Sequence, residues 1–423
     1  MILHEHLTFR REKIMNQFVR PLKIFLLFFM SISLLAGCGE KTVVKPVSPM
    51  DNPLHHYIQG MNALDEEGKD AVALQKFERA LSLQPSFSPA LSGKAIIQSR
   101  KTDRTLDTTH KATEIKRTLE LLESAENNSE SNADHFIYHV AATRVYSTIF
   151  ANTDWLSDSL DSYNDAIKIE GLTARDLPHY KNKNGAHYFM AVAYWRAGEF
   201  RKAEGLLATI QSSSGEGKWQ VLSNDLYRRA QKIIRASANY TLTNIAKKIA
   251  VKDQVTRADV AALIVTELKV DKLFGKQLRL MGKEVPKAPA FIPVDANNNI
   301  FSDEIMTVLR WKVKGLEPKY DATSQAKLFK PDTFVTRKEL ALIMQDVLIK
   351  ITGDKSIATS MIGNKSPFPD VNSSSPWFNA IMTMTSRNLM EPDFSSKFNP
   401  AKNADGAELL LATFQMRRHI NIH

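Results

Sequence analysis

The sequence predicts an all-α protein in two parts: a helical-repeat solenoid, then a helical domain of two to three short units. Three observations support this prediction. Residues 53–246 are a series of amphipathic helical runs separated by Gly, Pro, Asn and Ser, with scarcely a strand signal. After residue 250 one short helix-start pattern recurs. The composition, with 43% apolar and 24% charged residues, is ordinary for a folded chain.

Residues 1–38 are predicted to be an export signal. Arg20 and Lys23 form a basic region, and twelve almost entirely apolar residues follow, from position 24 to position 35. Twelve helical residues span about 18 Å, less than the roughly 30 Å of hydrocarbon in a bilayer. Met15 begins a more ordinary signal peptide than Met1. The segment therefore suits a cleaved signal better than a membrane span.

Cys38 is the only cysteine, and it ends the run Leu35, Ala36, Gly37, Cys38. This run resembles the bacterial lipobox, which implies a diacylglycerol on the thiol, with Cys38 as the new N-terminus and the site of lipidation. A short hydrophobic helix with a buried thiol is the alternative. Gly39 is not the aspartate that retains some Gram-negative lipoproteins at the inner membrane. The family rule therefore implies the outer membrane, or the cytoplasmic membrane if the source is Gram-positive.

Residues 39–52 are predicted to be a tether, because Pro46 and Pro49 keep them extended. The formal charge of the whole chain is +10. Residues 1–38 contain five bases and two acids, which leaves +7 for the rest. This balance favours acidic partners such as a wall polymer or lipid headgroups. We expect no nucleic-acid partner.

Residues 53–246 contain a recurring helical pair. The clearest copy runs from Gly68 to Pro85, with Ala73, Phe77 and Ala80 at helical spacing, and a second copy has counterparts at Gly198, Ala203 and Leu207. The pattern resembles the tetratricopeptide repeat (TPR), with a glycine at the turn and an aromatic side chain between helices. The resemblance implies a concave face that holds a protein or peptide partner. A generic helical bundle is the alternative.

Residues 250–423 repeat a second pattern. The run Val255, Thr256, Arg257, Ala258, Asp259 is matched by Val335, Thr336, Arg337, Lys338, Glu339. A third, altered copy has Gly406 in the arginine position. This pattern, with Phe368, Pro369, Asp370 upstream, resembles the S-layer homology domain over about residues 251–415. The first unit keeps only its Thr-Arg half, and residues 270–292 are expected to be an insertion or linker.

The candidate polymer-binding residues follow from this resemblance. Thr256 and Thr336 are predicted helix N-caps. Arg257 and Arg337 lie in first helical turns, where a base is unfavourable against the helix dipole, so we expect them to face outward and bind an anion. The resemblance implies contact with acidic wall polymers at this arginine, and Asp370 belongs to the same pattern and is a further candidate. Trp377, a candidate as well, and Trp311 could stack on sugar rings, or they could instead be core residues.

Several weaker signals carry no prediction of chemistry. His135 and His139 lack a third metal ligand, residues 295–306 lack the glycine and glutamate of a calcium loop, and residues 212–219 depart from a phosphate loop. We expect no metal, no cofactor and no catalysis.

The sequence predicts a lipid-anchored envelope protein that binds peptidoglycan or an associated acidic polymer and recruits a partner. The alternative is an assembly factor for an outer-membrane or secreted protein, with the C-terminal units purely structural.

Overall fold

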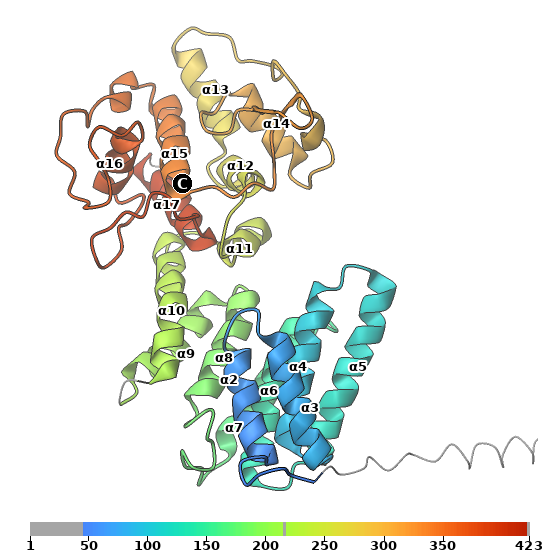
Figure 1. Ribbon diagram of the computed structural model, residues 1–423. Coiled ribbons are helices and arrows are strands. Elements are labelled where there is room, and N and C mark those ends of the chain that lie inside the picture. The colour runs from blue at the N-terminus through green and yellow to red at the C-terminus, as the bar shows by residue number, and fades with distance from the viewer. Residues whose placement is uncertain (1–44, 215–216, 421–423) are drawn as a thin grey trace, which may run out of the picture.

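The computed structural model describes residues 45–214 and 217–420 and confirms the all-α class. A lower body of paired helices and an upper C-terminal domain meet at helix α10 (Figure 1). The signal segment, Cys38 and residues 39–44 of the predicted tether lie outside the described residues. Within the described ranges, no helix is both long and apolar enough to cross a bilayer.

The N-terminal body consists of successive helices that pack as neighbours in chain order. Its pairs are α2 with α3, α4 with α5, α6 with α7, and α8 with α9, while α10 packs on α9. Their bounds are α2 Pro53–Leu64, α3 Asp70–Leu83, α4 Ser88–Arg104, α5 Thr108–Asn127, α6 Asn132–Ile149, α7 Trp155–Lys168, α8 Asn184–Arg196, α9 Phe200–Ser212 and α10 Lys218–Ala236. The first helix of one pair also packs on the first helix of the next, α4 on α6 and α6 on α8, which gives a solenoid-like body.

Phe77 on α3 fills the space between α2 and α4 and is fully buried. A methyl group on Gly60 of α2 would stand 2.5 Å from this ring, and one on Gly93 of α4 would also collide with it. Small residues on both sides therefore make room for one aromatic side chain. Gly68 and Gly198 take positive φ angles of 78° and 73° at the turns before α3 and α9, a conformation that glycine adopts without steric cost.

The C-terminal domain is built from short helices and one small hairpin. Its elements are α11 Asn244–Ala250, α12 Arg257–Thr266, α13 Val270–Leu280, η1 Val294–Ala296, α14 Ser302–Arg310, β1 Lys319–Asp321, β2 Ala326–Leu328, α15 Arg337–Thr352, η2 Lys355–Ala358, α16 Phe378–Ser386 and α17 Gly406–His419. Strands β1 and β2 pair antiparallel, with Lys319 opposite Leu328. Residues 270–292, expected to be an insertion or linker, include the helix α13, which packs on α15.

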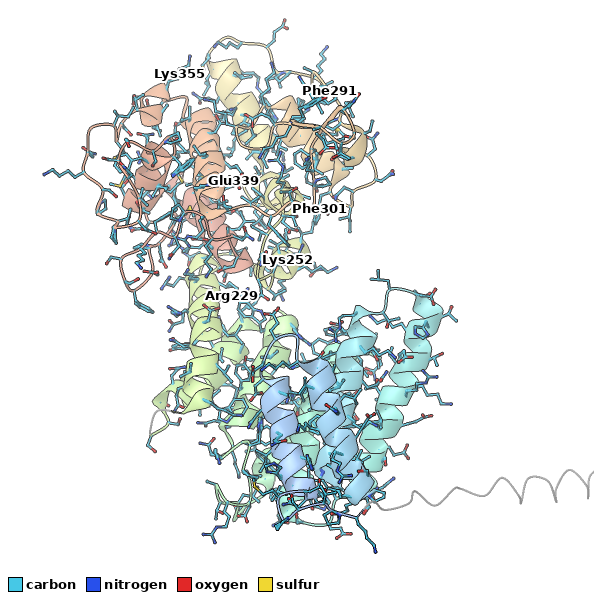
Figure 2. The ribbon with its side chains drawn as sticks, viewed as in Figure 1. Arg229, Lys252, Phe291, Phe301, Glu339 and Lys355 are labelled. Atoms are coloured by element: carbon cyan, nitrogen blue, oxygen red, sulfur yellow. The ribbon has the colours of Figure 1, made fainter. Side chains whose placement is uncertain are left out.

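The two parts of the protein join through α10 and α11, which both pack on α17. Arg229 of α10 donates hydrogen bonds to the Lys252 carbonyl at 2.8 Å and to Asp253 at 2.5 Å. Arg235, near the end of α10, forms an ion pair with Glu391 at 2.9 Å. Figure 2 shows Arg229 and Lys252 at this junction. The join therefore combines helix packing with two arginine contacts.

Candidate functional site: the three-unit C-terminal domain

Three chain segments of the C-terminal domain form a closed ring of backbone hydrogen bonds. The Val255 N–H donates to the Ala404 carbonyl at 2.9 Å, Ala404 donates to Val335 at 2.9 Å, and Val335 donates back to Val255 at 3.0 Å. Each of these residues lies two positions before the first residue of a long helix, α12, α15 or α17. The three units are therefore arranged as pseudo-equivalent parts around one axis.

The threonine and acidic positions of the recurring pattern cap the helices that leave this ring. Thr256 and Asp259 form a capping box on α12, and Thr336 and Glu339 form one on α15. These contacts match the predicted N-caps. Burial raises the pKa of Glu339, but hydrogen bonds from the Thr336 N–H and hydroxyl outweigh this effect and leave that pKa lowered. Asp405 caps α17 by accepting from the Glu408 N–H at 2.8 Å.

Arg257 lies inside the domain with 3% of its surface exposed. Its guanidinium donates to the carbonyls of Phe329 at 2.8 Å, Gly315 at 2.6 Å and Glu317 at 2.8 Å. It also lies over the Phe329 ring, 4.8 Å from the centroid. Burial lowers the pKa of Arg257. This side chain fixes the loop that precedes α15.

Arg337 has the equivalent place one unit later and is 8% exposed. It donates to the carbonyls of Phe398 and Glu391, both at 2.7 Å, and forms a buried ion pair with Glu408. Its guanidinium lies 4.7 Å from the Phe398 ring centroid. Burial raises the pKa of Glu408, while the charge of Arg337 opposes this shift. Both arginines therefore bind the phenylalanine loop of the following unit.

These contacts correct the expectation that Arg257 and Arg337 face outward to bind an anion. Each guanidinium uses its donors on backbone carbonyls or an internal carboxylate. This bonding also accounts for a base in a first helical turn, because the compensating groups come from the neighbouring loop rather than from a ligand. Neither side chain presents an open guanidinium to a polymer.

Asp370 is also hydrogen-bonded within the domain. Its carboxylate accepts from the N–H groups of Phe398 at 2.9 Å and Asn399 at 2.6 Å. Asp295 does the same for Phe329 and Lys330, at 2.9 and 2.7 Å. Asp295 therefore begins a unit equivalent to the one that begins at Asp370, a role that the sequence reasoning missed. The available signal was an aspartate upstream of each Phe-x-Pro run.

Gly406 replaces the arginine in the third unit because the chain leaves no room there. A side chain at Gly406 would collide with the Ile249 carbonyl oxygen at the end of α11. The Gly406 N–H donates to the Lys252 carbonyl at 2.9 Å. The end of helix α11 therefore packs against Gly406, the arginine position of the third unit. Helix α11 directly precedes the first unit, which lacks its upstream half.

The two tryptophans differ in accessibility. Trp377 is half-buried, and the Lys338 ammonium lies 4.4 Å from its ring centroid. Trp311 is 6% exposed and donates its indole N–H to Asp271 at 2.7 Å. Of the two, Trp377 keeps more surface for a ligand.

A basic groove of about 370 Å³ lies between α13, α14 and α15. Its lining includes several apolar side chains, among them Phe274, Leu278, Met281, Trp311 and Ile349. Two of its bases are neutralised, Arg310 by Asp271 and Lys350 by Asp346. Three exposed lysines form no ion pair with a carboxylate of the described residues: Lys283, Lys312 and Lys355. Lys355 lies at the end of the domain remote from Arg229 (Figure 2).

Residues 367–410, which include α16 and the start of α17, match the S-layer homology domain. The match supports a location in the cell envelope or at the cell surface, and a cell-wall polymer as a partner. No curated protein and no solved structure matches the chain.

Proposed function

We propose that the chain with this S-layer homology unit is a non-catalytic envelope tether, and that the groove between α13, α14 and α15 holds an acidic segment of the wall polymer. The observation that carries the proposal is the combination, in one lining, of three lysines without an ion pair and several apolar side chains, two of them aromatic. Ammonium groups attract the carboxylates or phosphates of the polymer, and apolar ring faces suit the C–H faces of sugars. In this proposal the lysines of the groove, rather than Arg257 and Arg337, bind the acidic groups of the polymer.

Sedimentation with purified sacculi tests this proposal on the full-length protein. We expect a variant with three substitutions in the groove to bind sacculi at least tenfold more weakly: Lys283→Gln, Lys312→Gln and Lys355→Gln. A matched control removes the same charge from exposed lysines elsewhere in the domain and should bind as wild type: Lys327→Gln, Lys365→Gln and Lys397→Gln. Equal binding by the two triple variants would exclude the groove as the polymer site. Wild-type binding should also weaken as salt is added.

The lipid anchor is the second part of the proposed function. Its support is the run Leu35 to Cys38 after a short apolar segment. Two or three acyl chains would hold the protein at the membrane at about 0.8 kcal/mol per buried methylene group. Labelling cells with an alkyne fatty acid should mark the wild-type protein and leave Cys38→Ala unmarked. Labelling of both proteins would place the lipid elsewhere.

The assembly-factor alternative is favoured by one observation, the internal bonding of Arg257, Arg337 and Asp370. These residues of the pattern stabilise the units themselves, as a purely structural domain would require. If full-length protein fails to sediment with sacculi but co-purifies with an outer-membrane or secreted protein, the alternative replaces the wall tether. In both schemes the N-terminal helices recruit a partner.

A further inference from the structure

The N-terminal body contains a groove of about 470 Å³ lined by the first helices of successive pairs. Helices α4, α6 and α8 contribute most of its wall, and Glu67, Gly68 and Asp70 from the α2–α3 turn and the start of α3 complete the lining. Apolar side chains on two of these helices form part of the surface: Ile96, Tyr188, Phe189 and Val192. The groove therefore lies on the face where adjacent pairs meet, and it has both apolar and charged walls.

Arg144 of α6 is the unusual residue of this groove. It is 7% exposed, and its Nη1 atom is buried without a hydrogen-bond partner. Its guanidinium lies 4.0 Å from the Phe189 ring centroid. Burial is the largest influence on the pKa of Arg144, which is lowered. Among the described residues, no carboxylate lies within ion-pair distance of it.

Three carboxylates line the same groove, those of Glu67, Asp70 and Asp103, but none of them forms an ion pair with Arg144. The carboxylate that most affects its pKa belongs to Asp65, and this carboxylate is paired with Lys218 at 3.1 Å. The Tyr57 hydroxyl is buried without a hydrogen-bond partner, and the buried Tyr180 hydroxyl is the neighbour that most raises the pKa of Arg144. A buried cation without an ion-pair partner is costly, so a bound anion would stabilise this region.

The other arginines of the groove are already engaged. Arg100 and Arg104 share the single carboxylate of Asp70, at 2.6 and 2.7 Å. Arg196 donates to the Ser147 carbonyl at 2.6 Å and to the Thr148 hydroxyl at 3.1 Å. Arg144 is thus the arginine of the groove with which an incoming carboxylate would form a new ion pair.

We propose that this groove binds an acidic peptide segment of a partner protein, with one carboxylate seated on the Arg144 guanidinium and apolar side chains packed along Ile96 and Val192. The inference rests on the proposed recruitment of a partner and names the chemistry of that partner. A planar carboxylate matches the geometry of the guanidinium. The apolar part of the wall suits the side chains of a peptide.

Fluorescence anisotropy on the full-length protein tests this inference. The probe is a fluorescein-labelled peptide, Leu-Ala-Glu-Leu-Asp-Ala-Leu, with a neutral counterpart that carries Gln and Asn. We expect the acidic peptide to bind at least tenfold more tightly than the neutral one. Arg144→Met should remove this preference, whereas Arg144→Lys should keep part of it because the charge remains and the planar fork is lost.

Two controls separate binding from folding. Arg175→Gln removes one exposed positive charge outside the groove and should bind both peptides as wild type. Arg144→Met should unfold at the same temperature as wild type or higher, because it replaces an unpaired buried cation with an apolar side chain. A lower melting temperature with unchanged peptide preference would assign Arg144 a structural role and overturn the inference.

Other outcomes would also overturn it: equal affinity for the two peptides, or acidic-peptide binding weaker than about 1 mM. Displacement of the peptide by soluble wall fragments but not by excess unlabelled peptide would assign the groove to the wall instead. Sedimentation of Arg144→Met with sacculi should remain at the wild-type level. Failure of the peptide inference is therefore distinguishable from failure of the polymer proposal.

Discussion

Replacement of Arg337 by methionine should destabilise the C-terminal domain strongly, because this arginine is bonded within the fold. The variant loses two carbonyl partners at 2.7 Å and leaves the Glu408 carboxylate buried without a cation. Breaking a buried ion pair by removing one partner costs about 3 to 5 kcal/mol of unfolding free energy. Arg257→Met strands three carbonyls but no buried partner carboxylate, so we expect a smaller loss of about 2 to 3 kcal/mol.

Urea unfolding of the full-length variants measures the change in unfolding free energy, and hydrogen exchange of the α17 amides then tests whether the C-terminal domain is the part that is destabilised. The double variant Arg337→Met with Glu408→Leu removes both charges and should recover part of the stability. The coupling between the two sites should be at least about 1.5 kcal/mol. If Arg337→Met keeps wild-type stability and instead loses binding to sacculi, the arginine contacts a ligand and the structural reasoning is wrong.

Three further predictions concern packing and pH. Gly406→Ala should cost about 1 to 3 kcal/mol by thermal unfolding, because its methyl group meets the end of α11, whereas Gly205→Ala has open space and should stabilise slightly. Phe77→Ala should cost about 3 to 5 kcal/mol in urea unfolding; a loss below about 1 kcal/mol would contradict its role between helices. Burial, then the nearby Lys218, lowers the pKa of His179 to about 2. Below about pH 6.5 the His179 side chain therefore takes up a proton in the unfolded chain but not in the folded protein. The free energy of unfolding should then fall on acidification by about 1.4 kcal/mol per pH unit, and His179→Gln should make this dependence on pH weaker.

The all-α class and the helix starts could be predicted because they depend on local rules. Thr256 and Thr336 followed by an acid three residues later specify N-caps wherever the helix packs. Gly68 and Gly198 mark turns for an equally local reason, their positive φ. These features need no knowledge of neighbouring elements.

The orientation of Arg257 and Arg337 could not be predicted, because it depends on loops far away in the chain. Local electrostatics indicated that each base needs a partner, and the sequence offered no way to decide between a ligand and a carbonyl of the next unit. The role of Asp295 and the collision at Gly406 depend on the same long-range arrangement. Helix α13 was missed because its residues carried no part of the recurring pattern.

The cyclic bonding of Val255, Val335 and Ala404 has a consequence for biogenesis. Because each segment donates to one neighbour and accepts from the other, none of the three can find both partners until the last of them has been synthesised and exported. A chain shortened before Ala404 would leave both remaining segments half-bonded. Quality control in the envelope should therefore remove C-terminal truncations, even those that keep the whole N-terminal body intact.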